Sequence, residues 1–474
     1  MPSQLTGVTR QVMAAMNYDR FLSDTAKARC PQPLRVSFER MLNSGVDATQ
    51  FINMAGGLPN TSLFPFVSAE FKLRDGSSLT IEGKRMEAAQ QYGATSGDGT
   101  FKKKVAEFLE MNHNPPTSKI SNEEQRLEFS VIPGAQCGIR MSFDLLLNPG
   151  DYYIVEDPTY TGALGTTRPM NYKPLAVATD DKGMIPSELK KLLDRWGPEA
   201  AKDPESDIPK CLYIIPTGTN PSGVTLPEQR RREIYQIARE YDLMIIEDDP
   251  YFFINFEDER PPSFLSLDVD GRVLRMDSFS KIIAAGFRIG VASGPNYLIQ
   301  RLMWDLQTMM GQPPSVSQVL LAELFEKWGE DGFKKQQERC REFYRQKRDL
   351  VDMYASKHLQ GLAEWVTPSA GMFLWLKIQG IEDTRSFIDG SLADERVLFA
   401  PGFCFMTNPS DPCPYIRASF SNTSEEDMDT GFARLAVAIK VELAKSQNGR
   451  AQMSSSIAST NDTQKFHFAS KIQG

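Results

Sequence analysis

The chain has 474 residues, of which 41% are hydrophobic and 24% are charged, an ordinary globular composition for two or more domains. Its net charge of −8 argues against a general nucleic-acid or membrane-surface binder, although a local basic pocket for an anionic ligand remains compatible with it. No apolar run approaches membrane-spanning length. We therefore expect neither a nucleic-acid partner nor a membrane partner.

The cysteines and histidines narrow the chemistry further. The six cysteines are scattered without a CxxC pair, which predicts free thiols in a reducing compartment. Neither a charged-then-apolar leader nor a terminal SKL is present, so we expect a cytoplasmic protein. Only three histidines occur, and none lies near another candidate metal ligand. Neither a metal site nor a histidine-based triad is predicted.

The first hundred residues contain an arm and two loops. Residues 1–50 predict an N-terminal arm with mixed helical pieces that belongs to a small domain. The loops AGGLPNTSLFP (55–65) and QYGATSGDG (91–99) are rich in small residues, and the second leads into a helical pattern, FKKKVAEFLE. Each loop taken alone is also ordinary turn chemistry.

From residue 128 onward, strand and helix patterns alternate. Strands are indicated at EFSVIPG, YYIVEDPTY, CLYIIPTGTNPSG, LMIIEDDPYFFI and VLRMDSFSK, and helices at AQCGIRMSFDLLLN and PEQRRREIYQIAREY. This alternation predicts an α/β fold, with a mostly parallel sheet covered by helices on both faces, in a large domain spanning 51–330. In such sheets, ligands bind beyond the carboxyl ends of the strands.

A second domain is predicted after this sheet. The chain is expected to turn helical after residue 290, with a long amphipathic helix over 329–358 that could link two domains. The short strands EWVTP, MFLWLKI, RVLFAPG and YIRASFS and a final helix over 425–445 then predict a smaller α+β domain, residues 331–445. Residues 446–474 are rich in Ser, Thr, Gln and Asn and predict a disordered tail.

The stretch SFSKIIAAGFRIG (278–290) carries one lysine, Lys281, at the end of a predicted strand. Lysine amines form Schiff bases with carbonyls, and pyridoxal phosphate (PLP) is the common carbonyl cofactor. Ser278, Ser280 and Arg288 are the donors that a phosphate would need beside that amine. The alternative interpretation is a solvated lysine on a loop.

Other strand ends carry residues that suit the same cofactor. Residues 134–136 open a helix, so their backbone N–H groups can bind a phosphate. Tyr160 is an aromatic side chain that could stack on a pyridine ring. Asp248 ends a buried strand and needs a cation, for which a protonated pyridine nitrogen fits. Asn220 and Tyr251 could reach the phenolate oxygen of the same ring.

Arg417 lies in the otherwise apolar strand YIRASFS, where an arginine wants a bidentate carboxylate partner. Each of these features has a plainer interpretation. Asn-Pro-x-Gly is a common turn, Asp-Asp-Pro-Tyr is a common strand exit, and Arg417 could form only a structural ion pair. The joint order of the motifs is far more specific than any one of them.

In that order the chain resembles the fold type I, PLP-dependent aminotransferases of class I/II, over roughly residues 50–445. Within that family it is most similar to the kynurenine/2-aminoadipate and fungal aromatic branch, by the segments AGGLPNTSLFP, QYGATSGDG, EDDPYFF, SFSKIIAAGFRIG and YIRASFS. The resemblance implies transfer of an amino group from an aromatic or long-chain 2-amino acid to a 2-oxo acid. The implied donors are phenylalanine, tyrosine, tryptophan, kynurenine and 2-aminoadipate, with 2-oxoglutarate as the usual acceptor in a ping-pong mechanism.

The resemblance also implies how the cofactor is held. Lys281 would carry PLP, Asp248 would pair with its ring nitrogen, and Tyr160 would stack on the ring. Asn220 and Tyr251 would hold the phenolate oxygen. The phosphate would be held by Gln136, Ser278, Ser280, Arg288 and, from the second subunit of a homodimer, Tyr92. Ala135 departs from relatives that often have a hydroxyl residue, which leaves its backbone N–H as the donor.

For the substrate, the resemblance implies that Arg417 binds the α-carboxylate. Gly57, Leu58 and Asn220 are the other expected substrate-binding residues, because the loop AGGLPNTSLFP offers apolar side chains and few fixed charges to a flat ring. Two other functions remain open. One is a different PLP reaction on the same fold, such as a lyase or decarboxylase reaction. The other is an aminotransferase-like transcriptional regulator, for which the roughly 50 residues before the fold are too few to hold a DNA-binding module.

Overall fold

The structure is a computed structural model that describes residues 16–34, 52, 54 and 57–445. The predicted tail, residues 446–474, and residues 1–15 and 35–50 of the predicted arm lie outside the described residues. The chain divides into two compact units. The first contains the residues up to Thr219, Val224–Glu342 and Ser369–Gly371, and the second contains Asn220–Gly223, Phe343–Pro368 and the residues from Met372 onward.

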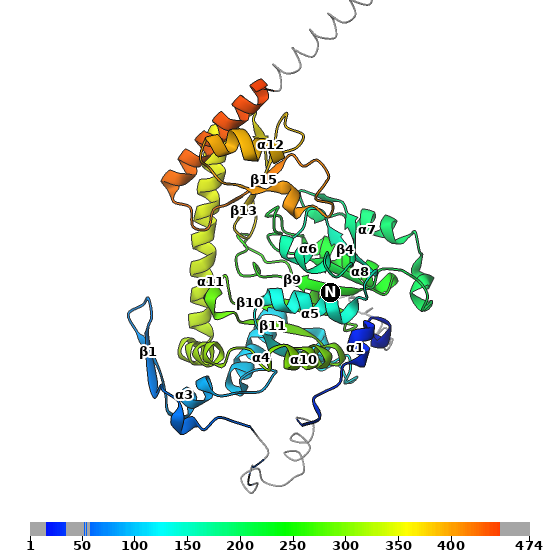
Figure 1. Ribbon diagram of the computed structural model, residues 1–474, viewed down its shortest axis with the longest axis vertical. Coiled ribbons are helices and arrows are strands. Elements are labelled where there is room, and N and C mark those ends of the chain that lie inside the picture. Colours follow the sequence, from blue (N-terminus) through cyan, green and yellow to red (C-terminus); the bar gives the residue numbers. More distant parts are fainter. Residues whose placement is uncertain (1–15, 35–51, 53, 55–56, 446–474) are drawn as a thin grey trace, which may run out of the picture. The chain divides into compact units, whose positions relative to one another are not determined.

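The first unit is built on a seven-stranded sheet in the order β3-β11-β10-β9-β8-β4-β5. The labels of β9, β10 and β11 lie side by side in Figure 1, in agreement with this order. Neighbouring strands from β10 through β5 are parallel, and β11 runs antiparallel to both its neighbours. This arrangement confirms the predicted mostly parallel sheet. The strands are β3 (Leu127–Ile132), β4 (Tyr152–Glu156), β5 (Lys173–Val177), β8 (Cys211–Ile214), β9 (Met244–Asp248), β10 (Val273–Ser278) and β11 (Gly290–Pro295).

The antiparallel strand β11 corrects one expectation. The chain was expected to turn helical directly after residue 290, but Gly290–Pro295 forms β11 and the helix α10 begins only at Asn296. All six residues of β11 are buried, because the strand lies between β10 and β3. Its sequence, GVASGP, has too few large apolar side chains to give a strand pattern.

Helices cover both faces of this sheet, as predicted. Met244 and Ile246 of β9 belong to the core on one face, and Ile245 belongs to the core on the other. This alternation is the period of a strand that is buried on both sides. The first face is covered by α5 (Ala135–Leu146), α6 (Thr161–Thr167) and α10 (Asn296–Met310), and the second by α7 (Pro186–Leu193), α8 (Glu228–Glu240) and α9 (Phe264–Leu267).

The described part of the N-terminal arm, residues 16–34, belongs to the first unit, whereas the sequence had placed the arm in the small domain. The hydroxyl of Tyr18 donates to the carbonyl of Gly271 at 2.7 Å, and the backbone N–H of Ser23 donates to the carbonyl of Leu145 at 2.8 Å. Phe21 is fully buried in the core that α5 covers. The arm packs against the first unit because its apolar side chains are buried in this core. It includes the short helix α1 (Asp24–Ala28).

The remaining elements of the first unit precede β3 or follow β5. Asp98 caps the predicted helix after the second loop, since its side chain accepts the N–H of Phe101 at 2.9 Å. A two-stranded antiparallel hairpin and the helix after it were not predicted. These elements are β1 (Ser68–Lys72), β2 (Ser78–Glu82), α3 (Gly83–Gln90), α4 (Gly99–His113), β6 (Thr179–Asp180) and β7 (Gly183–Met184).

The long helix α11 (Ser315–Leu359) departs from helical geometry at Gly329, where φ is 56° and ψ is −168°. The helix predicted over 329–358 is its second part, and the boundary between the units falls within it, after Glu342. None of the described helices is long and apolar enough to span a bilayer.

The second unit contains a four-stranded antiparallel sheet in the order β12-β13-β15-β14, with a helix over residues 425–445. All four predicted strand segments contribute to it. The strands are β12 (Ala363–Glu364), β13 (Phe373–Ile378), β14 (Ala400–Pro401) and β15 (Tyr415–Ser419), and a short helix α12 (Arg385–Phe387) continues into one π-helical turn (Ile388–Leu392).

Candidate active site

The carboxyl edge of the large sheet brings most of the predicted site residues together. β9 ends at Asp248 and β10 ends at Ser278, and these parallel neighbours place Met276 opposite Asp248. Lys281 follows directly in the loop after β10. Because β11 runs back from Gly290, which pairs with Ser278, that loop is held at both ends by adjacent strands. Lys281 and Asp248 therefore lie at one edge of one sheet.

Asp248 is 3% exposed, and its two carboxylate oxygens have different surroundings. Oδ2 accepts a hydrogen bond from the hydroxyl of Tyr213 at 2.7 Å, whereas Oδ1 is buried and has no hydrogen-bond partner among the described residues. Burial raises the pKa of Asp248 to about 7, although the hydrogen bond from Tyr213 lowers it. A buried carboxylate oxygen without a donor is costly. A cationic N–H donor at Oδ1 would therefore stabilise the ionised Asp248 carboxylate.

The amino-terminal end of α5 lies at the same edge of the sheet and presents backbone N–H groups there. Gly134 precedes the helix with φ of 84°, and the first backbone N–H groups of a helix have no partner within it. A Cβ placed on Gly134 would lie 2.3 Å from Nη2 of Arg288, so the backbone and the guanidinium approach closely only because this residue is glycine. A Cβ on Gly290 would lie 3.1 Å from the backbone nitrogen of Ala135, which places β11 here too.

Arg288 lies in the left-handed region with φ of 53°, an uncommon backbone conformation for a residue other than glycine. Its Nη1 donates to Ser280 Oγ at 3.4 Å and to the carbonyl of Ala285 at 3.1 Å. The backbone N–H of Ser280 donates to Ser278 Oγ at 3.2 Å. One guanidinium, two hydroxyl groups and the start of α5 therefore surround one position.

The side chain of Gln136 is directed away from this position. Its Nε2 donates to the carbonyl of Gly162 at 3.1 Å and to Thr166 Oγ1 at 3.3 Å, so it joins α5 to α6. Only its backbone N–H remains for an anion. A Cβ on Gly162 would lie 2.4 Å from both Gln136 Oε1 and Cε1 of Tyr160, which places the Tyr160 ring beside Gln136. Tyr251, in the turn after β9, is 4% exposed.

The second unit brings two further predicted residues together. Nη1 of Arg417, in β15, donates to Oδ1 of Asn220 at 2.7 Å. The Arg417 guanidinium carbon lies 4.0 Å from the ring centroid of Phe373 and 4.7 Å from that of Phe405. These two phenylalanines, which the sequence analysis did not single out, restrict where the guanidinium can point.

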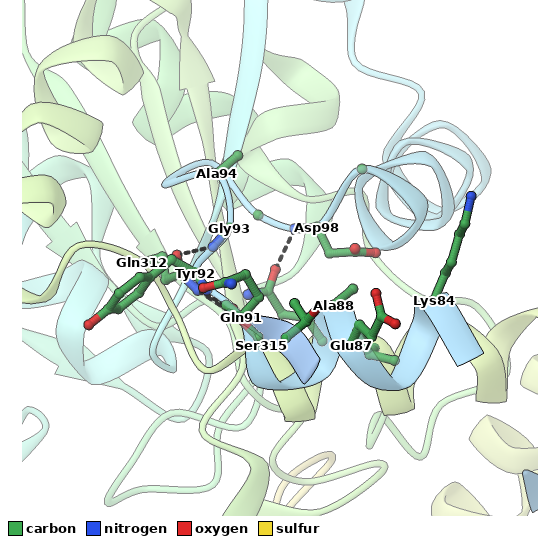
Figure 2. A pocket seen from close by; sticks show the side chains of 15 residues that line it. Lys84, Glu87, Ala88, Gln91, Tyr92, Gly93, Ala94, Asp98, Gln312 and Ser315 are labelled. Carbon is green, nitrogen blue, oxygen red and sulfur yellow. Dashed lines mark hydrogen bonds between the residues drawn. The ribbon is translucent and has the colours of Figure 1, made fainter. Parts of the chain in front are cut away.

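Tyr92 lines a different pocket of the first unit, with a volume of about 440 Å³. Figure 2 shows Tyr92 at one end of this pocket and Lys84 at the other. Tyr92 is 68% exposed, and Gln91 beside it donates from Nε2 to the carbonyl of Pro59 at 2.8 Å. Gly57 and the exposed Leu58 directly precede Pro59. Neither Lys281 nor Asp248 lines this pocket.

A buried ionic cluster on the opposite face of the strand ends was also missed. Arg275 is fully buried and contacts Glu247 Oε1 at 2.9 Å, Asp249 Oδ2 at 3.2 Å and Asp277 Oδ1 at 2.8 Å. Burial raises the pKa of Asp277, but Arg275 and His113 outweigh burial and lower it to about 2. These pairs hold β9 and β10 together beside Asp248. Two features of the sequence could have predicted this cluster. One apolar strand ends in three consecutive acidic residues, and the next predicted strand contains a single arginine.

Known proteins match nearly the whole chain. The family model described as aminotransferase class I and II matches residues 60–435. A kynurenine/alpha-aminoadipate aminotransferase, mitochondrial, of Rattus norvegicus is 42% identical over 425 residues, which cover 90% of this chain and 99% of the relative. A crystal structure of an aminotransferase from Candida albicans has a TM-score of 0.78 at 26% identity and covers 91% of this chain and 99% of that one.

A kynurenine aminotransferase of Pyrococcus horikoshii, solved in complex with PMP, has a TM-score of 0.69 at 28% identity and covers 90% of this chain and 98% of that one. The similarity is not confined to the segments around Lys281, because each match spans both compact units. These matches confirm the resemblance on which the expected fold and site rest. The chain belongs to the class I and II aminotransferases.

Proposed function

We propose that the protein is a PLP-dependent aminotransferase that takes the amino group of an aromatic or long-chain 2-amino acid and passes it to a 2-oxo acid such as 2-oxoglutarate. One observation carries the cofactor assignment. A buried carboxylate with one oxygen lacking a donor, on Asp248, ends the strand beside the one that delivers Lys281. A protonated pyridine nitrogen is the kind of cationic donor that such an oxygen needs.

The rest of this edge fits the same cofactor. The N–H groups at the start of α5, with Ser278, Ser280 and Arg288, form a binding position for a phosphate. We assign the aldehyde of the cofactor to the amine of Lys281, which lies in the loop that follows β10. Tyr160 provides a ring to stack on the pyridine. We assign Asn220 and Tyr251 to the phenolate oxygen by the family resemblance.

When bound, PLP supplies the electron sink that makes the Cα–H of an amino acid acidic. The chain's own residues do the remaining work. Lys281 Nζ would take the proton from the substrate Cα as general base and would then give it, as general acid, to the C4′ carbon of the bound cofactor. Asp248 Oδ1 holds a proton on the ring nitrogen and so stabilises negative charge on the ring. Arg417 binds the substrate α-carboxylate and orients Cα.

The substrate class follows from the relatives named above and from a loop with few fixed charges. Gly57 and Leu58 are proposed to contact the substrate side chain, together with Asn220. An apolar loop accepts a flat ring or the methylenes of a longer acid. Because one methylene changes such binding by only about 1–3 kcal/mol, we expect broad specificity.

We also propose a homodimer in which Tyr92 reaches the phosphate of the partner subunit. Its exposure of 68% leaves the side chain available for such a contact, and a two-fold dimer is the commonest oligomer. An active monomer in light scattering at assay concentration would contradict this homodimer.

We propose a cytoplasmic location, supported by six free cysteines that fit a reducing compartment. The rat relative is named as mitochondrial, so microscopy of a tagged protein must decide.

The activity is tested by kcat/KM with 2-oxoglutarate and, in turn, phenylalanine, tryptophan, kynurenine, 2-aminoadipate, aspartate and alanine. At least one aromatic or long-chain donor should exceed aspartate and alanine by about tenfold, which is roughly 1.4 kcal/mol. Glutamate must appear in step with the new 2-oxo acid. A tenfold preference for aspartate or alanine over every other donor, or products without glutamate, would overturn the proposal.

A further inference from the structure

The hydrogen bond between Tyr213 and Asp248 joins two fully or almost fully buried side chains on neighbouring parallel strands. Tyr213, in β8, pairs with Ile246 of β9, so its side chain points to the same face as Asp248. The hydroxyl oxygen lies 2.7 Å from Asp248 Oδ2. Oδ1 of the same carboxylate has no hydrogen-bond partner among the described residues. The two oxygens are therefore not equivalent.

The Tyr213 ring cannot easily move away from this position. It is fully buried, and its centroid lies 5.6 Å from that of Phe143, which in turn contacts Tyr153 at 5.1 Å. Protein interiors are close-packed, so a fully buried ring that packs against Phe143 has little room to move, and its hydroxyl stays near Asp248. The fixed hydroxyl fixes the plane of the carboxylate as well.

We propose that Tyr213 is a positioning residue for the cofactor ring: by occupying Oδ2 of Asp248, it directs Oδ1 toward the ring nitrogen of PLP. This inference rests on the proposed function, since it assigns the ring nitrogen to Oδ1. A carboxylate that is free to rotate would present either oxygen or neither in line with the N–H. The hydroxyl removes that freedom and leaves one acceptor for one donor.

The simpler alternative is that the Tyr213 hydroxyl only satisfies a buried acid and has no effect on the cofactor. The chain offers a matched control for this alternative. Tyr153 is also fully buried, belongs to the same aromatic group, and hydrogen-bonds through its hydroxyl to Thr167 Oγ1 at 2.9 Å. Tyr213→Phe and Tyr153→Phe each remove one buried hydroxyl and keep the ring.

The experiment compares the binding of two cofactors to the apoprotein by equilibrium titration. One is PLP, and the other is 1-deazapyridoxal phosphate, in which a C–H group replaces the ring nitrogen. Tyr213→Phe should weaken PLP binding by about tenfold, because Oδ1 would no longer be aligned for its charged hydrogen bond with the ring N–H. It should change binding of the deaza analogue by less than about twofold, because that ring has no N–H for Oδ1.

Tyr153→Phe should leave the ratio of the two affinities as it is in the natural protein. If Tyr213→Phe loses the same affinity for both cofactors, or loses affinity for neither, the inference is wrong. The proposed function would still hold in that case, because it depends on PLP binding and transamination by the natural protein. Failure of the natural protein to bind PLP would instead remove the proposed function itself.

The melting temperature of each apoprotein shows whether the variants fold. If Tyr213→Phe does not fold, 3-fluorotyrosine at position 213 keeps the ring and makes the hydroxyl a stronger donor. It should change the affinity ratio by at least about twofold, whereas 3-fluorotyrosine at position 153 should not. An unchanged ratio at position 213 would again overturn the inference.

Discussion

The guanidinium of Arg417 and the amide oxygen of Asn220, 197 positions apart in the sequence, are joined by a hydrogen bond of 2.7 Å. The bond uses one arm of the guanidinium fork and leaves the Asn220 amide N–H groups as donors. Phe373 and Phe405 contact the same guanidinium at 4.0 and 4.7 Å. These three contacts therefore restrict the orientation of the Arg417 side chain.

Replacing Arg417 with lysine should lower kcat/KM for every amino donor by about 10- to 100-fold, because an ammonium cannot form the fork that binds a carboxylate. The loss should be similar for phenylalanine and 2-aminoadipate, since the α-carboxylate is common to both. Steady-state kinetics with both donors measure it. Arg434→Lys, an exposed position in the same unit, serves as the control. A change of less than twofold in Arg417→Lys would remove Arg417 from the substrate site.

Replacing Lys281 with alanine should abolish transamination, because Lys281 is the residue proposed to bind the cofactor and to move the proton. The natural protein should be yellow, and borohydride should fix the cofactor on the peptide that contains Lys281, as peptide mass spectrometry can show. Lys202→Ala, which removes an exposed lysine paired with Glu199 at 2.6 Å, should behave as the natural protein does. An active Lys281→Ala protein that borohydride still labels would disprove the assignment.

The sequence predicted the large sheet because its parallel strands carry long apolar runs that end in polar turns. The same reasoning located Asp248 and Lys281, since both directly follow such runs. It failed for β11, where six small or apolar residues give no clear period. It also failed for the hairpin of β1 and β2, whose strands have only partly buried faces.

Contacts between distant segments lay beyond sequence reasoning. Tyr213 and Asp248 are 35 positions apart, and nothing in the strand CLYII shows that its tyrosine points to the same face as the aspartate on another strand. Gln136 was predicted to bind the phosphate, and nothing in the sequence showed that its side chain would form hydrogen bonds to α6 instead. The hydrogen-bond partner of a side chain depends on which distant residues the fold brings near it, and the local sequence does not contain that information.

Replacing Gly134 with alanine should weaken PLP binding by about tenfold or more, because the added Cβ would displace Arg288 from the start of α5. That Cβ would lie 2.3 Å from Arg288 Nη2. The comparison is with Gly150→Ala, which imposes a similar positive φ, 99° against 84°, but has no atom within 4 Å of the new Cβ. Titration of both apoproteins with PLP measures the effect.

The strain from the positive φ should lower the stability of both variants by similar amounts. Only Gly134→Ala should also lose cofactor affinity. Equal PLP affinities in the two variants would show that Arg288 does not depend on the close approach to Gly134 for its role.

The apoprotein should lose stability as Asp248 ionises. Burial raises the pKa of Asp248 in the folded protein to about 7, from an ordinary value of 3.8. The folded state therefore binds the proton more tightly than the unfolded state does, and the free energy of unfolding falls as the pH rises between these two values. Asp248→Asn removes this dependence, because the amide carries no charge at any pH in that window.

The measurement is urea unfolding of the two apoproteins at pH 5, 6, 7 and 8. Relative to the natural protein, Asp248→Asn should gain stability by up to about 1.4 kcal/mol per pH unit between pH 5 and 7, with the gain levelling off above that. Asp181→Asn, at an exposed position, controls for the loss of one negative charge. If the natural protein and Asp248→Asn lose or gain stability in parallel across this range, Asp248 is already ionised in the apoprotein at pH 5. The carboxylate would then have to find a donor other than the cofactor, and its unpaired Oδ1 would no longer argue for a pyridinium there.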